Sequence, residues 1–144
     1  MLKPRDLDSS EYRALAELRY QIRCFLTFSE SAVRAARIEP QQHQLLLVLK
    51  ALAPPEKPNI RTVARRLLIQ HNSAVELVRR SAERGLLQRR TSKLDRREAS
   101  LHLTPMGQRV LRRLSLAHRE ELRSAAPSLL AAVEAVIGAR RTAS

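Results

Sequence analysis

The stretch that decides the fold is VARRLLIQHNSAVELVRRSAERGLLQRRTSKLDRREASLHLTP, residues 63–105. Val63 and Leu67 share one face of a short predicted helix. The polar run Gln70–Ser73 interrupts that helix and offers side chains that can cap a new one. The second helix continues to Arg84, where Gly85 suits the residue that follows a helix end. Its predicted buried stripe consists of Ala74, Leu77, Val78 and Ser81. The stretch therefore opens with two helices joined by a turn.

Two strands and a polar loop follow the second helix. Leu86–Thr91 is typical of a short strand, and the alternating run Ala99–Leu103 is typical of its partner. Residues 92–98 between them form a polar, basic loop. Thr104 suits a helix cap, and Pro105 suits the first position of the next helix. This order of helix, turn, helix, strand, basic loop and strand predicts a winged helix-turn-helix.

A long helix is predicted before this stretch. Asp8 suits its cap, and Glu11 completes a capping box. Apolar residues from Leu15 to Val33 then repeat with helical spacing, within a helix that could span about residues 9–37. A long first helix with a single apolar stripe often packs against a second chain.

Two further helices are predicted on either side of the winged segment. One begins at Pro40 and ends before the Pro54-Pro55 pair. Its run Leu45–Leu49 makes it apolar nearly all round, which indicates a buried central helix. At the other end of the chain, Pro127 is predicted to start a last, separate helix.

Composition agrees with a helical domain of ordinary size. The chain has 144 residues, enough for one domain, and 44% of them are hydrophobic. Only 3% are aromatic and only three are glycine, which favours helix packing and argues against an all-β sandwich. The predicted fold class is mainly α with a small β-hairpin wing (α+β), in a single domain over residues 1–144.

The charge of the chain points to an anionic partner. Lysine and arginine number 27 against 14 acidic residues, which gives a net charge of +13. Residues 61–97 hold eleven lysines and arginines and three acids, or +8 of that total. Such an excess favours nucleic acid or an anionic membrane surface. The alternative is a solvated, arginine-rich surface, which does not predict such concentration.

Cysteine usage and hydropathy suggest a compartment. A single cysteine, Cys24, excludes an internal disulfide and fits a reducing environment. The polar first ten residues do not resemble a signal peptide, and the longest apolar run, Leu45–Leu49, is too short to span a bilayer. We therefore expect a soluble, cytoplasmic protein that does not engage a membrane.

The polar turn before the second helix suits the reading of DNA. An α-helix fits the major groove, and residues at its N-terminus meet the edges of bases. Gln70, His71, Asn72 and Ser73 supply more hydrogen-bonding groups than a cap alone would need. Arginines at the tip of a hairpin can enter the narrow minor groove, where the potential is most negative.

Five segments together resemble the MarR family of bacterial regulators. They are Val63–Leu67, Ser73–Val78, Arg84–Arg89, Asp95–Arg97 and Leu101–Gly107. The resemblance covers roughly residues 39–122. It implies a homodimer whose terminal helices interleave. It also implies binding to a palindromic operator in double-stranded DNA, usually as a repressor that a small anionic or phenolic ligand, or oxidation, releases.

The resemblance assigns regions and residues to roles. Dimerisation helices are expected at about 9–37 and 105–140, and a DNA-binding lobe at about 40–104. Asp95 would steady the wing, Arg97 would reach the minor groove, and Arg96 would contact phosphate or groove. The predicted DNA-binding residues are Gln70, His71, Asn72, Ser73, Glu76, Arg79, Arg80, Asp95, Arg96 and Arg97. For Arg80, a solvated helix face is an equal alternative.

Other candidate sites are weaker. Some relatives sense peroxides through a cysteine in the first helix, but here a plain buried thiol is favoured for Cys24. The four histidines do not pair at metal-binding spacing, so no metal and no cofactor is predicted. No catalytic motif is present, which argues against an enzyme.

Two other functions compete with a sequence-specific regulator. A non-specific, architectural DNA-coating protein would discriminate poorly between operator and random DNA. A protein-interaction module would have kept the fold and lost DNA binding. The polar set Gln70–Ser73 argues against the first, and the basic wing argues against the second. The identity of any small-molecule effector is left open.

Overall fold

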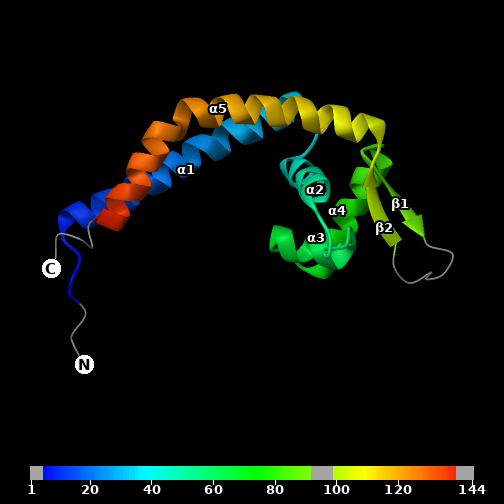
Figure 1. Ribbon diagram of the computed structural model, residues 1–144, viewed down its shortest axis with the longest axis horizontal. Coiled ribbons are helices and arrows are strands. Elements are labelled where there is room, and N and C mark those ends of the chain that lie inside the picture. Colours follow the sequence, from blue (N-terminus) through cyan, green and yellow to red (C-terminus); the bar gives the residue numbers. More distant parts are fainter. Residues whose placement is uncertain (1–4, 92–98, 139–144) are drawn as a thin grey trace. The chain divides into compact units, whose positions relative to one another are not determined.

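The computed structural model describes residues 5–91 and 99–138. The elements along the chain are α1 (Ser9–Ala35), α2 (Pro40–Ala51), α3 (Ile60–Leu67), α4 (His71–Glu83), β1 (Leu87–Thr91), β2 (Ala99–Leu103) and α5 (Pro105–Gly138) (Figure 1). The described residues fall into two compact units, one of residues 32–116 and one of residues up to 31 together with residues from 117. Five helices and one antiparallel strand pair confirm the predicted fold class.

The unit of residues 32–116 contains two apolar cores. The first core lies among α2, α3, α4 and the strands, and its buried members are Leu45, Leu49, Val63, Ala74, Leu77, Val78, Leu87 and Leu101. The second core joins the ends of α1 and α2 to the start of α5, and its members are Val33, Ile38, Leu46, Leu86, Leu111 and Leu114. Adjacent residues of α2, Leu45 and Leu46, are both fully buried and enter different cores.

Local signals in the sequence set the helix ends. The Asn59 side chain accepts a hydrogen bond of 2.9 Å from the Thr62 amide and so caps α3. Leu68 ends α3 in the left-handed region, with φ 56°. Gly85 follows α4 with φ +73°, a conformation that glycine adopts without strain. The predicted cap of the helix that starts at Pro105 is confirmed, because the Thr104 hydroxyl accepts from the Gly107 amide at 3.0 Å.

The strand pair is tied to the helices at both ends. Leu87 pairs with Leu103 and Thr91 pairs with Ala99, in antiparallel register. The amide of Leu101 donates to the carbonyl of Pro58 in the loop before α3, at 2.7 Å. The strands are thereby anchored to the helix-turn-helix that precedes them.

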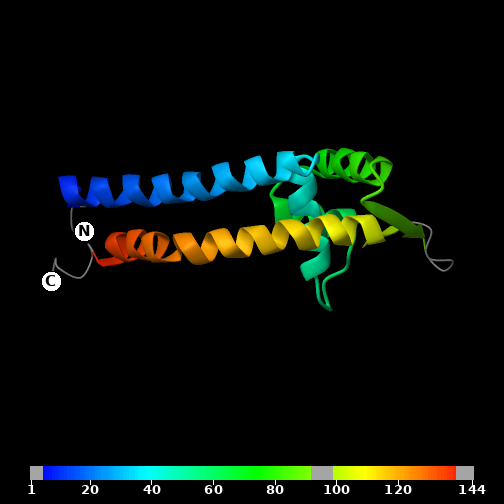
Figure 2. The same ribbon diagram turned by 90° about the horizontal axis from the view of Figure 1, so that it is seen from above.

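The other unit is made of the first part of α1 and the second part of α5, which lie side by side (Figures 1 and 2). His118 of α5 is buried and shares a hydrogen bond of 2.7 Å with the Ser29 hydroxyl of α1. The rings of Phe25 and Phe28 meet the His118 ring edge to face, at 6.0 and 5.6 Å between centroids. Much of the apolar surface here is not covered: Leu26 is 48% exposed and Leu130 is 60% exposed.

Several expectations about the helices were wrong in detail. Pro127 does not start a new helix but lies inside α5. A proline removes one backbone hydrogen bond, and the alanine- and leucine-rich turns around it have high helix propensity, so the helix continues. The second helix is not buried all round, since Leu47 is 42% exposed. Helix α1 ends at Ala35, two residues earlier than expected, and Arg37 adopts φ 62°.

A close backbone approach joins the helix-turn-helix to α5, and it yields a stability prediction. A Cβ added at Gly107 would lie 2.0 Å from the carbonyl oxygen of Leu86, a backbone atom that cannot rotate away. Gly107→Ala should therefore lower the free energy of unfolding by about 2 kcal/mol, as overpacking does elsewhere. The measurement is chemical denaturation followed by circular dichroism.

Gly138→Ala is the matched control, because no heavy atom lies within 4 Å of the added methyl group. It should change the free energy of unfolding by less than about 0.5 kcal/mol. Equal stability of the two variants would contradict the close approach at Gly107.

Candidate nucleic-acid interface

Helix α4 is fixed in place by its buried stripe. Ala74, Leu77, Val78 and Ser81 are all 0% exposed, as the sequence predicted. The Ser81 hydroxyl donates to the carbonyl of Leu77 at 2.8 Å, so this buried polar group is satisfied. Because one face is held in the core, the opposite face of α4 must point to solvent.

The predicted reading residues lie together at the start of α4. Gln70 is the N-cap residue, and its side chain makes no capping hydrogen bond. His71, Asn72 and Ser73 form the first turn, and all four side chains are exposed. The side-chain hydrogen-bonding groups are therefore available to a partner, together with the unpaired amides of a helix N-terminus.

Two other predicted residues, Glu76 and Arg79, form an ion-pair network with Glu83. Arg79 donates through Nε and Nη2 to Glu76 Oε2, at 3.1 and 2.9 Å, and through Nη1 to Glu83 Oε1 at 2.7 Å. Hydrogen bonds from Arg79 lower the pKa of the Glu76 carboxyl below its usual value. Contacts with Glu76 first, and Glu83 second, raise the pKa of Arg79. These contacts favour the charged forms of Glu76 and Arg79.

Arg80, whose side chain is 36% exposed, forms an ion pair with an acidic residue. Its Nη2 lies 3.0 Å from Glu39 Oε2, at the start of α2. Nearby, Arg84 donates to the carbonyl of Arg37. Both arginines link α4 to the segment before α2. The position of Arg80 is thus explained by a partner 41 residues away, which helix periodicity cannot reveal.

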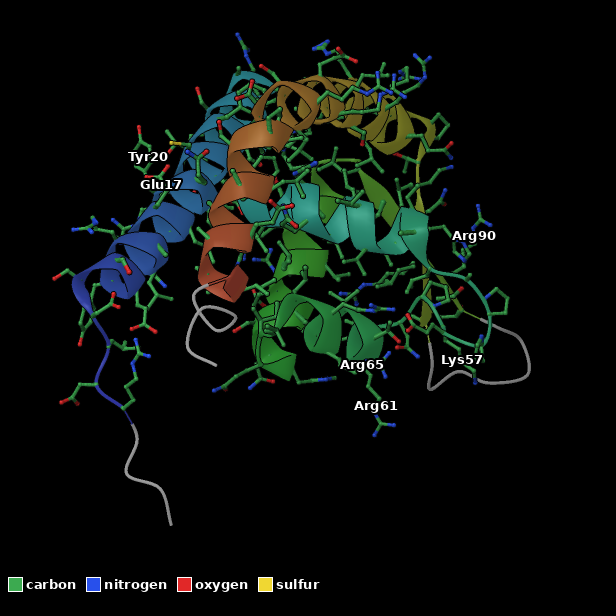
Figure 3. All side chains as sticks on the ribbon, turned by 60° about the vertical axis from the view of Figure 1, so that its left-hand side comes forward. Glu17, Tyr20, Lys57, Arg61, Arg65 and Arg90 are labelled. Carbon is green, nitrogen blue, oxygen red and sulfur yellow. The ribbon has the colours of Figure 1, made fainter. Side chains whose placement is uncertain are left out.

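A group of cations that the site prediction left out surrounds the helix-turn-helix. Arg61 and Arg65 project from α3, Lys57 from the loop before it and Arg90 from β1 (Figure 3). Within residues 5–91 and 99–138, the guanidinium groups of Arg61 and Arg90 make no ion pair. The excess of cations over residues 61–97 was the signal that could have named Arg61, Arg65 and Arg90, whereas Lys57 lies before that segment.

Glu56 partly neutralises this group. Its carboxylate accepts from Arg66 Nε at 3.3 Å and lies 3.7 Å from Arg65 Nη2. The ion pairs tie the loop before α3 to α3 itself. Asp95, Arg96 and Arg97, the predicted tip of the wing, lie outside the described residues.

An apolar groove with a basic rim lies elsewhere in the same unit. It has a volume of about 650 Å³, between α2 and the start of α5. Leu47, Pro105 and Leu111 line it with apolar surface, and Lys50 and Arg112 bring positive charge. The exposure of Leu47, which the sequence did not predict, is explained by its place in this groove.

Cys24 differs from the expected buried thiol, because its side chain is exposed. It lies one turn after Tyr20 on α1, the helix on which Figure 3 labels Tyr20 and Glu17. A hydrogen bond with Cys24 is the main cause that raises the pKa of Tyr20.

Two negative observations apply to the described part of the chain. Among those residues, no three His, Cys, Asp or Glu side chains are grouped as metal ligands would be. None of the described helices combines the length and the apolar character that crossing a membrane requires.

Comparison with known proteins now adds to this geometry. Residues 38–98, which include α2, α3, α4 and β1, match the model of the MarR family. Through this segment the chain is similar to the MarR family. No curated protein sequence matches the chain.

Solved structures of MarR regulators share the fold. AbsC, a MarR family transcriptional regulator from Streptomyces coelicolor, has a TM-score of 0.71 and 17% identity, over 84% of this chain and 81% of its own. Sco3205 from the same organism, a MarR family regulator solved in complex with DNA, has a TM-score of 0.69 and 22% identity, over 85% of this chain and 77% of its own.

A third structure is a MepR mutant from S. aureus bound to an oligodeoxyribonucleotide. Its TM-score is 0.64 and its identity 17%, over 74% of this chain and 76% of its own. At these identities the likenesses establish the fold, and the MarR fold is what the sequence predicted.

Proposed function

We propose that this protein is a sequence-specific, DNA-binding transcriptional regulator of the MarR family, and that it acts as a repressor. The observation that carries the proposal is the exposed first turn of α4. Gln70, His71, Asn72 and Ser73 project from a helix whose opposite face is fully buried. A rigid helix with a polar N-terminal turn is what reading base edges in the major groove requires.

The surrounding cations support DNA as the partner. Arg61 and Arg90 lie on α3 and β1, the elements that flank α4 in the chain. Contacts of this kind with phosphates position a protein on the duplex, while contacts with bases supply specificity. Sco3205 and MepR, which share this fold, were both solved with DNA. Three roles in the wing stay predictions: Asp95 would steady it, Arg97 would reach the minor groove, and Arg96 would contact phosphate or groove.

We further propose that the protein binds a palindromic operator as a homodimer. The apolar side chains of α1 are exposed in the single chain: Leu15 is 42% exposed, Ile22 43% and Leu26 48%. On α5, Leu130 and Ile137 are 60% and 59% exposed. Contiguous apolar surface of this kind marks an interface. Two copies would place two α4 helices on two half-sites, about 10 bp apart. Such a regulator works in the cytoplasm, where its operator lies.

A small-molecule effector would fit the groove between α2 and α5. Its volume of about 650 Å³ lies in the range of ligand sites. Apolar walls with Lys50 and Arg112 at the rim suit a small apolar anion. Such a ligand can release the operator only if it binds the two conformations of the protein with different affinity.

DNA binding is tested with two duplexes of 30 bp: one enriched from a random pool by the purified protein, and the unselected pool itself. The wild type should prefer the enriched duplex by at least about 10³-fold. Arg61→Ala and Arg90→Ala should weaken binding to both duplexes by similar factors. Each lost phosphate contact should also reduce the slope of log affinity against log salt concentration by about 0.9. Arg119→Ala on α5, also an exposed arginine, is the control.

The other functions have distinct outcomes in this assay. Equal affinity for the two duplexes would support a non-specific coating protein. No binding to either duplex at low salt would support a protein-interaction module and refute the proposal.

The dimer is tested by sedimentation equilibrium. Leu26→Glu places a charge in the exposed apolar surface of α1 and should shift the protein from dimer to monomer at micromolar concentration. Thr27→Glu adds the same charge at the next, exposed residue and should leave the dimer intact. A monomeric wild type would refute the arrangement.

The groove is tested with 1-anilinonaphthalene-8-sulfonate, a fluorescent apolar anion. The double variant Lys50→Ala/Arg112→Ala should weaken binding of the probe about tenfold. The reason is that a hydrogen bond to a charged group contributes roughly 1.5 kcal/mol or more. Arg119→Ala/Arg123→Ala removes two charges from the same protein outside the groove and should have no effect. If both double variants bind the probe with equal affinity, the probe binds outside this groove.

A further inference from the structure

The Glu76–Arg79–Glu83 network is a feature that a DNA-binding helix does not need for its fold. The side chains of Glu76, Arg79 and Glu83 are 55%, 49% and 65% exposed. Ion pairs this exposed add little to stability. The network also carries a net charge of −1, from two carboxylates and one guanidinium. Negative charge on a surface that is to approach phosphates calls for an explanation.

The position of the network is set by helix geometry. Residues three or four apart share a face of a helix. Asn72, Glu76, Arg79 and Glu83 follow each other at spacings of four, three and four residues, so they form one stripe. The buried stripe of α4, from Ala74 to Ser81, occupies the opposite side. The network therefore lies on the same exposed face as the reading turn.

All three nitrogen atoms of the Arg79 guanidinium already have partners. Nε and Nη2 donate to Glu76, and Nη1 donates to Glu83. These bonds use three of the five N–H donors of Arg79. A bidentate contact with DNA through Nε and Nη2 therefore requires Arg79 to leave Glu76, and a contact through the engaged Nη1 proton requires it to leave Glu83. A carboxylate left near phosphates, without its cation, is repelled by them.

We propose that Glu76 and Glu83 set the DNA specificity of this protein by restraining Arg79 and opposing non-specific contact with phosphates. The inference rests on the proposed function. On random DNA, the exchange of Arg79 from carboxylate to phosphate exposes uncompensated negative charge. On the operator, an amino group of a base, such as cytosine N4, can donate to Glu76 and recover that loss. Discrimination then comes from a repulsive element as well as from attractive contacts.

The chain offers a matched control for this network. Glu120 accepts from Arg123 Nη1 at 3.2 Å on α5, also at a spacing of three residues, and both side chains are about two-thirds exposed, at 67% and 65%. Glu120→Gln raises the net charge by one, as Glu83→Gln does, but on α5 and not on α4. A general effect of net charge would appear in both variants, whereas a local effect would appear only in α4.

The experiment measures the affinity of each variant for the unselected 30-bp pool and for the duplex enriched by the wild type, over a series of salt concentrations. Glu83→Gln should bind the unselected pool about five- to tenfold more tightly than the wild type. Its salt slope should steepen by about 0.9, the value for one added phosphate contact. Affinity for the enriched duplex should change by less than twofold, so the specificity ratio falls.

Two further variants separate the parts of the proposal. Glu83→Gln/Arg79→Ala should return both the pool affinity and the salt slope to wild-type values, because the freed guanidinium is gone. Glu76→Gln should weaken discrimination at a single base position, detected by enrichment with that variant. Thermal unfolding checks that all variants fold alike.

The outcomes distinguish this inference from the function on which it rests. If Glu83→Gln and Glu120→Gln bind the pool alike, the specificity role of the network is refuted while DNA binding stands. If the double variant keeps the steeper salt slope, Arg79 is not the restrained group and the inference is overturned. Absence of wild-type binding to either DNA would refute the proposed function itself.

Discussion

The burial of one stripe of α4 is the constraint on which the rest of the structure depends. Ala74, Leu77, Val78 and Ser81 are fully enclosed, so the helix cannot rotate without exposing apolar surface to water. That single restraint determines which residues face solvent. It places Asn72 and the ion-pair network on one exposed stripe, where a partner can meet them together.

A second restraint lies at the junction of α4 with the strand pair and the start of α5. Gly85 turns the chain with a positive φ, Leu86 is buried, and its carbonyl accepts from the Thr104 amide at 3.1 Å. Gly107 is needed because α5 passes so close to that carbonyl. The junction joins the two cores of residues 32–116, since Leu86 belongs to one and Leu87 to the other. A displacement of the start of α5 at this junction would therefore also displace β1.

The sequence predicted what depends on local chemistry and missed what depends on distant partners. Capping residues, helix periodicity and Gly85 gave the element order, and the buried stripe of α4 was correct residue by residue. The partner of Arg80, Glu39, lies 41 residues away, and no spacing rule points to it. The groove beside Leu47 arises from the packing of α2 against α5, which composition does not reveal. Pro127 misled because a proline that suits a helix start is also tolerated within a long helix.

The net charge of +13 overstates the charge available to a partner. Arg66 is paired with Glu56, Arg79 with two carboxylates and Arg80 with Glu39. A cation that exchanges a carboxylate for a phosphate gains little, because one ion pair replaces another. Cations without such a partner, Arg61 and Arg90 among the described residues, gain the full contact. The distribution of acids among the arginines therefore decides how tightly the protein binds DNA of any sequence. Contacts with bases must supply the additional affinity for the operator.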